Sequence, residues 1–255
     1  LEAVLFALNH HVWDPLLEMR IGAVINALAL TLLLYFLASP LKNDSRLALT
    51  VLFIGLFITP FGWENILTGF GAQFYFFLLF SIYFLFGVCA YQPTQRVWLL
   101  CVLSGLLCPL SLASGAVTLI IGSAAYISRN PILNIDKNKS IAYLYSVVFL
   151  FVACASIAIS PSPPAHSILK AHSVNQFASA LIQVMSWPMK KGIVSALFVQ
   201  MPLLLFFVIF LFVNEFRTRY NYFVFVIIAW LLSQYAILAY ARSVAPVSSR
   251  YIDIY

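Results

Sequence analysis

The feature that most constrains this chain is a series of long apolar runs separated by short polar segments. Crossing a membrane takes about 20 mostly apolar residues in a helix, and these runs approach that length. Of the 255 residues, 63% are hydrophobic and 9% are charged, whereas soluble domains carry roughly 25% charge. We therefore predict an all-α, polytopic transmembrane bundle in contact with a lipid bilayer, with about eight membrane helices. They are placed at 21–38, 46–61, 73–91, 97–111, 114–127, 141–160, 193–213 and 222–241.

The charge pattern argues against a nucleic-acid partner, and the cysteine pattern argues against disulfides and a cysteine metal site. The net charge of +6 is scattered, with no basic run, so nucleic acid is not expected as a partner. All four cysteines fall inside apolar runs and lack CxxC spacing, so neither a disulfide framework nor a cysteine metal site is expected. The chain starts at Leu1 rather than Met and stops at Tyr255 in what reads as mid-sequence. We expect it to be a fragment, forming a single transmembrane domain.

The distribution of Lys and Arg predicts the orientation of the bundle. With residues 1–20 outside and eight crossings, four inner loops hold eight of the 14 Lys and Arg residues, as the positive-inside rule requires. They are Lys42, Arg46, Arg96, Arg129, Lys137, Lys139, Arg217 and Arg219. The assignment depends on the short pair 97–111 and 114–127, which could be two tilted helices or one broken element dipping into the membrane.

Two outer loops follow from this orientation. The first is 1–20 and the second is 161–192. Residues 174–187 carry apolar side chains at helical spacing, which predicts an amphipathic helix lying on the outer surface. A ninth short span is the alternative.

Charged residues just before the first span are candidate catalytic groups. Glu18, or less favourably Asp14, could act as a general base on a sugar hydroxyl or ligate a divalent metal. Arg20 could hold a phosphate, or it could be a basic flank that snorkels to the interface.

A polar hinge at 62–74 separates the second and third runs. Its Glu64 and Asn65 are candidate substrate-binding groups, since a carboxylate at a membrane boundary usually marks function. Gln73 would lie near them, or would instead bond to a neighbouring helix. Further along, the segment 111–115 either aims helix N-terminal amides at an anion or packs closely through small residues.

Two arginines follow the last complete span. Arg242 and Arg250, with Tyr251 beside the second, are suited to a phosphate or pyrophosphate. A basic flank is again the alternative.

Taken in order, these motifs resemble bacterial multi-pass membrane proteins of the GT-C glycosyltransferase superfamily. The resemblance covers nearly the whole chain. The motifs are Glu18-x-Arg20-Ile21, Trp63-Glu64-Asn65-x-x-x-Gly69-Phe70-x-x-Gln73, the Ser/Gly break at 111–115, and Ser249-Arg250-Tyr251.

The resemblance implies an enzyme of the bacterial inner membrane that works at its outer face. Such enzymes take a sugar from a polyprenyl-phosphate carrier and add it to a glycan, lipid or protein acceptor. By resemblance, the catalytic acid lies in the first outer loop, which places Glu18 or Asp14 in that role. The remaining candidates would bind substrate: Arg20, Glu64, Asn65, Gln73, Arg242, Arg250 and Tyr251. No cofactor is assigned, and a divalent metal ion stays open.

Two other functions compete with this hypothesis. A transporter or flippase of lipid-linked glycans would need polar groups within the spans, where Asn26 and Gln200 are the candidates and no buried charge is expected. A polysaccharide polymerase is chemically close to the transferase and is not separated from it by the sequence.

Overall fold

The computed structural model describes residues 7, 12, 14–57, 72–93, 95–133, 139–160 and 167–244. All regular secondary structure in these ranges is helical. The elements are α2 (Pro15–Ala38), α3 (Asn43–Phe57), α5 (Ala72–Ala90), α6 (Arg96–Ser111), α7 (Gly115–Leu133), α8 (Lys139–Ile159), α10 (Val174–Ser186), α11 (Ile193–Phe212), η2 (Asn214–Phe216) and α12 (Arg219–Ala241).

Each expected apolar run coincides with a helix where the structure describes it, the run 46–61 being described as far as residue 57. In the described part of the chain, six helices are long and apolar enough to cross a membrane: α2, α5, α7, α8, α11 and α12. This makes the chain an integral, multi-pass membrane protein in contact with lipid. Because α3 and α6 are shorter, the count of eight crossings stays a prediction.

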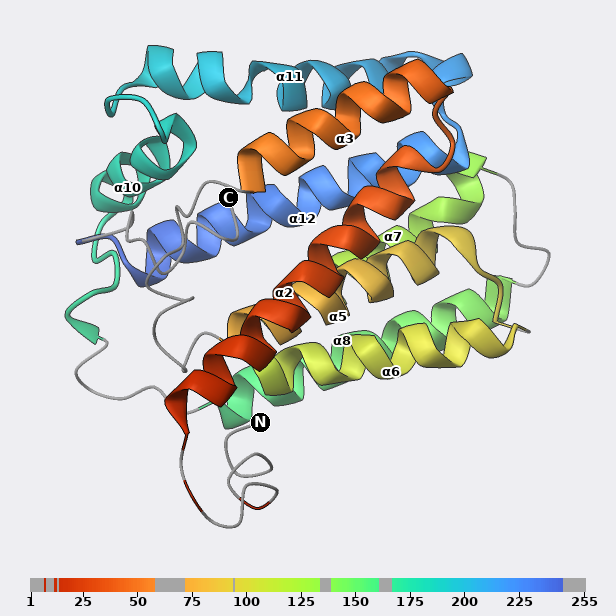
Figure 1. The fold of residues 1–255 in the computed structure, drawn as a ribbon, viewed down its shortest axis with the longest axis horizontal. Helices are drawn as coiled ribbons and strands as arrows, with labels where there is room; N and C mark the ends of the chain where they lie inside the picture. Colours follow the sequence, from red (N-terminus) through yellow and green to blue (C-terminus); the bar gives the residue numbers. More distant parts are fainter. Residues whose placement is uncertain are drawn as a thin grey trace.

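The bundle has two distinct ends (Figure 1). Helices α2, α5, α7 and α11 run toward one end, and α3, α6, α8 and α12 run back. We name the end with Asp14 the outer end and the opposite one the inner end, after the sides that the positive-inside rule gives them. Helices α6 and α7 form an antiparallel pair joined at 112–114 (Figure 1), and whether both cross the membrane stays a prediction.

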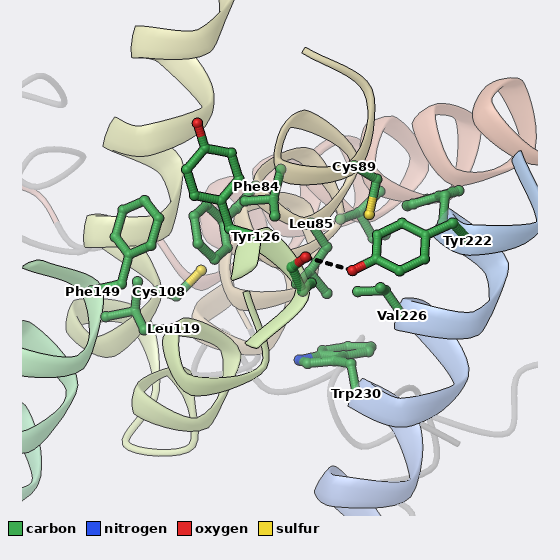
Figure 2. Packing of buried hydrophobic residues seen from close by; sticks show 14 of the residues in the cluster. Phe84, Leu85, Cys89, Cys108, Leu119, Tyr126, Phe149, Tyr222, Val226 and Trp230 are labelled. Carbon is green, nitrogen blue, oxygen red and sulfur yellow. Dashed lines mark hydrogen bonds between the residues drawn. The ribbon is translucent and has the colours of Figure 1, made fainter. Parts of the chain in front are cut away.

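Helix α5 is the centre of the packing and contacts α2, α6, α7 and α12. Two glycines let its neighbours approach. A Cβ atom at Gly87 would lie 2.2 Å from Sγ of Cys101, and one at Gly122 would lie 2.2 Å from Cε1 of Phe84. Figure 2 shows α12 contributing Tyr222, Val226 and Trp230 to this core from a single side of the helix. Close approach through small residues is how helices associate where lipid surrounds them.

A layer of hydrogen bonds crosses this core. The indole N–H of Trp230 donates to Oγ1 of Thr118 at 2.9 Å, and that hydroxyl lies 3.2 Å from Oγ of Ser81. The layer ties α12, α7 and α5 together and satisfies polar groups that lipid cannot.

Three arginines cap the inner ends of helices by donating hydrogen bonds to backbone carbonyls there. Arg46 donates to the carbonyls of Ala38, Ser39 and Leu41 after α2. Arg129 donates to the carbonyls of Val88 and Tyr91 at the end of α5, and Arg217 donates to those of Phe210 and Leu211 at the end of α11. A cation here satisfies the last carbonyls of a helix and complements its dipole.

The first helix begins earlier than the sequence predicts. The loop expected over 1–20 ends at Asp14, whose carboxylate accepts from the amides of Leu16 and Leu17, with Pro15 in the first turn. Aspartate before proline is a strong helix start, and it places Glu18 and Arg20 inside α2.

The segment 167–192 is docked on the bundle. Its helix α10 covers the region where an amphipathic helix is expected and packs against α11 and α12. The amide of Ala171 donates to the Tyr240 carbonyl, and the Gln200 side-chain amide donates to the Met185 carbonyl. Its position at a membrane surface remains a prediction.

Arg129→Ala should destabilise the protein because it leaves the carbonyls of Val88 and Tyr91 without their buried partner. We expect a loss of roughly 1–3 kcal/mol and a lower Tm in detergent. Arg96→Ala is the control, since Arg96 is exposed at the same end, and it should change stability by less than about 0.5 kcal/mol. Equal Tm values for the two variants would contradict a capping role for Arg129.

Candidate functional site

Three helix faces meet at the inner end of the bundle. At the inner end, Phe36 of α2 stacks on Phe86 of α5 with ring centroids 3.5 Å apart, and Phe223 of α12 packs edge-on against Phe86 at 5.2 Å. The rings of Phe36 and Phe223 are 6.2 Å apart. One face each of α2, α5 and α12 therefore points into a common interface.

The helical repeat carries these same faces to the outer end. Glu18 precedes Phe36 by eighteen positions, which is five turns at about 3.6 residues per turn. Tyr75 precedes Phe86 by eleven positions, and Gln234 follows Phe223 by eleven, which is about three turns. Glu18, Tyr75 and Gln234 therefore project from the faces that meet in the aromatic cluster. We call these three residues the outer polar cluster.

Contacts at the outer end set the levels of these side chains. A Cβ atom at Gly22 would lie 3.5 Å from the ring of Tyr75, and Glu18 is one turn further out on the same face of α2. The rings of Phe77 and Trp230 are 5.8 Å apart, and Gln234 is one turn further out along α12. Glu18 and Gln234 are thus both at about the level of the first turn of α5 along the bundle axis. In Figure 1, α2 and α12 diverge toward this end.

All three members of the cluster are buried. Exposure is 3% for Glu18, 2% for Tyr75 and 5% for Gln234. Burying a carboxylate is costly, and ionisable groups within membrane helices usually belong to functional sites. A buried carboxylate can accept a proton from a bound hydroxyl group.

The other predicted site residues surround the cluster without joining its face. Asp14 is occupied as the cap of α2. Arg20 is exposed and lies two positions from Glu18, about 200° around the helix, so the two do not share a face. Gln73 is exposed in the first turn of α5, and Arg242 is half-buried after the end of α12. Glu64, Asn65, Arg250 and Tyr251 lie outside the described residues.

The proposed anion site at 111–115 is not supported by the backbone. The amides of Gly115, Ala116 and Val117 donate to the carbonyls of Leu112, Ala113 and Ser114. A Cβ atom at Gly115 would lie 2.2 Å from the Cys108 carbonyl. The small residues therefore serve close packing of α6 on α7, as the alternative interpretation held.

The expectation that no span carries a buried charge is wrong. Glu18 in α2 and Arg129 in α7 are both buried. The helices extend beyond the apolar runs, because Asp14 starts α2 early and α7 continues to Leu133. Gln200, a candidate for a transport path, binds the Met185 carbonyl and so ties α11 to α10.

Sequence reasoning missed Tyr75 and Gln234. Both lie within apolar runs, where aromatic and amide side chains commonly serve packing. Their spacing to Phe86 and Phe223 places them on the same helix faces as those residues. This helps only once the rings of Phe86 and Phe223 are known to be in contact. As for metals, the described residues contain no group of three or more His, Cys, Asp or Glu side chains placed to hold an ion.

Cysteine labelling tests which side of the membrane the outer polar cluster faces. In a Cys154→Ala background, which removes the one exposed cysteine, Gln73→Cys and Lys190→Cys should react with a membrane-impermeant maleimide added outside intact cells. Lys42→Cys and Arg96→Cys, exposed at the inner end, should react only after the membrane is opened. The reverse pattern would put the cluster on the cytoplasmic side.

Comparison of the chain with protein-family models, curated proteins and solved structures gives no match in any of the three.

Proposed function

We propose that this protein is a membrane glycosyltransferase that uses a polyprenyl-phosphate-linked sugar at the outer face of the bacterial inner membrane. The observation that carries the proposal is the burial of Glu18, 3% exposed, near one end of a bundle of apolar helices. A buried carboxylate at a lipid–water boundary is where a hydroxyl group of a lipid-borne or glycan substrate could lose its proton.

Glu18 is the base in this scheme. Its carboxylate takes the proton from an acceptor hydroxyl while the hydroxyl oxygen bonds to C1 of the sugar. The bond between C1 and the carrier phosphate oxygen breaks, and the phosphate leaves with the electron pair. Configuration at C1 inverts. Asp14 is the weaker candidate, because its carboxylate already accepts two backbone amides of α2.

The leaving phosphate needs positive charge. Arg242 lies at the outer end of α12, and Arg250 follows it in the sequence. Guanidinium groups bind phosphate oxygens in a bidentate manner and stabilise the charge that develops during departure. Arg20 is exposed on another face of α2, which suits contact with lipid headgroups better than contact with the reacting phosphate.

Glu18→Gln should abolish transfer in the full-length protein, with a loss of about 100- to 10,000-fold, because the amide cannot accept the proton. The assay would use proteoliposomes and a panel of radiolabelled polyprenyl-phosphate monosaccharides, and would measure release of polyprenyl phosphate. Arg250→Ala should also abolish transfer. Both variants should keep the wild-type Tm.

Asp14→Ser is the matched control. Serine also caps a helix N-terminus, so the variant removes a carboxylate one turn from Glu18 and keeps the start of α2. Transfer should persist in this variant. Full activity in Glu18→Gln would remove Glu18 from the reaction, and movement of intact carrier across the vesicle without release of its phosphate would favour the flippase alternative.

A further inference from the structure

Four cationic residues lie on segments that meet at the inner end of the bundle. The phenol O–H of Tyr220, in the first turn of α12, donates to the Leu37 carbonyl at 3.0 Å. The guanidinium of Arg46, in the first turn of α3, donates to the next carbonyl, that of Ala38, at 3.2 Å. The first turns of α3 and α12 therefore both contact the last turn of α2. Helix α11 ends there as well, since only 213–218 separate it from α12.

We call the four cations on these segments the basic corner: Lys42, Arg46, Arg217 and Arg219. Backbone carbonyls hold two of them in place. The Nε and Nη2 atoms of Arg46 and of Arg217 donate to carbonyls at the inner ends of α2 and α11. Neither Nη1 atom has an acceptor among the described residues, and the Arg46 side chain is exposed. A planar guanidinium fixed in this way is suited to phosphate oxygens.

The basic corner carries an excess of positive charge. Lys42 and Arg219 are exposed, and their side chains form no hydrogen bond with the described residues. Two carboxylates, Asp44 and Glu215, lie on the same segments and are also exposed. Within the described ranges neither carboxylate forms an ion pair with the four cations. Four cations against two carboxylates leave a formal charge of +2, which favours an anionic partner.

Exposed apolar side chains follow α3 and α11 away from the basic corner. On α3, Leu47, Val51 and Ile54 are exposed and share one face of a helix that buries none of its residues. On α11, Val208 and Phe212 are exposed one turn apart, beside the carbonyls that bind the neighbouring arginine. The corner therefore places fixed cations next to surface that hydrocarbon would cover.

This combination selects among the possible occupants. A free phosphate ion would use the cations and leave the apolar faces uncovered. A second copy of the chain would cover those faces and bring more positive charge, since Lys and Arg outnumber Asp and Glu by 14 to 8. A phospholipid with a negatively charged headgroup matches both parts, because its phosphate is joined to acyl chains.

We propose that the basic corner binds an anionic phospholipid, whose phosphate contacts Arg46 and Arg219 and whose acyl chains cover the exposed faces of α3 and α11. Lys42 and Arg217 add positive charge around the phosphate. The site is at the opposite end of the bundle from Glu18, and it does not depend on the proposed transfer reaction. Because α3 packs on α2 and buries none of its own residues, lipid on this face also stabilises the position of α3.

The test is native mass spectrometry of the full-length protein in neutral detergent, with the Tm followed in parallel. Dioleoylphosphatidylglycerol is the anionic probe. Dioleoylphosphatidylcholine offers the same acyl chains without net charge, and inorganic phosphate offers the anion alone. Phosphatidylglycerol should bind saturably and raise the Tm. Phosphatidylcholine should bind at least about 5-fold more weakly, and inorganic phosphate should leave the Tm unchanged.

Variants locate the site. Arg219→Gln and Lys42→Gln should each weaken phosphatidylglycerol binding about 5-fold, the effect of one cation beside an anionic lipid. Both should keep the ligand-free Tm, because neither side chain is hydrogen-bonded to the described fold. Arg96→Gln is the matched control. It removes an exposed cation of the inner end from α6, which packs on α5, α7 and α8, and should change the affinity less than about 2-fold.

Several results would overturn the lipid site. They are equal binding of the two phospholipids, unchanged affinity in Arg219→Gln, or a loss in Arg96→Gln as large as in Arg219→Gln. A rise in Tm with inorganic phosphate equal to that with phosphatidylglycerol would instead indicate a site for a free anion. A mass spectrum of paired chains without bound lipid would assign the face to a second copy. Because binding is measured in detergent without substrate, neither the orientation of the bundle nor the transfer reaction affects the outcome.

Discussion

The arrangement depends on the close packing of α5 against its neighbours. Lipid supplies no hydrophobic drive between helices, so association relies on contact distance and on polar groups that satisfy one another. Gly87 allows α6 to approach α5, and Gly122 accepts the ring of Phe84 from α5. With α5 held from that side, α2 and α12 pack on its remaining faces, and their register determines which side chains face one another.

The sides of α2, α5 and α12 that meet at the inner end change character along the helices. At the inner end they form an aromatic cluster of Phe36, Phe86 and Phe223, which is inexpensive to bury. At the outer end the same faces carry a carboxylate, a phenol and an amide. An apolar inner half gives the interface its stability, while the polar outer half carries a burial cost that packing alone does not explain.

The two ends of the bundle also use charge differently. At the inner end, Arg46, Arg129 and Arg217 each bind the last carbonyls of a helix, so residues from which the orientation was predicted also complete the backbone hydrogen bonding. Arg129 binds these carbonyls while its side chain is buried, and its guanidinium carbon lies 4.5 Å from the ring centroid of Tyr126. At the outer end, Glu18 projects into the interface, and this difference in charge use is what distinguishes the candidate site.

The sequence by itself determined the helices and their directions. Long apolar runs require helices in lipid, and the bias of Lys and Arg assigns an end to each loop. It also singled out Glu18, because a carboxylate beside a span is rare. Only the tertiary structure decided that Glu18 is buried while Arg20 is exposed, and that Tyr75 and Gln234 are buried in α5 and α12. Hydropathy shows where a residue lies along the axis of a helix. Whether its side chain is buried depends on which face of the helix contacts its neighbours, and this is set only when the helices pack in a definite register.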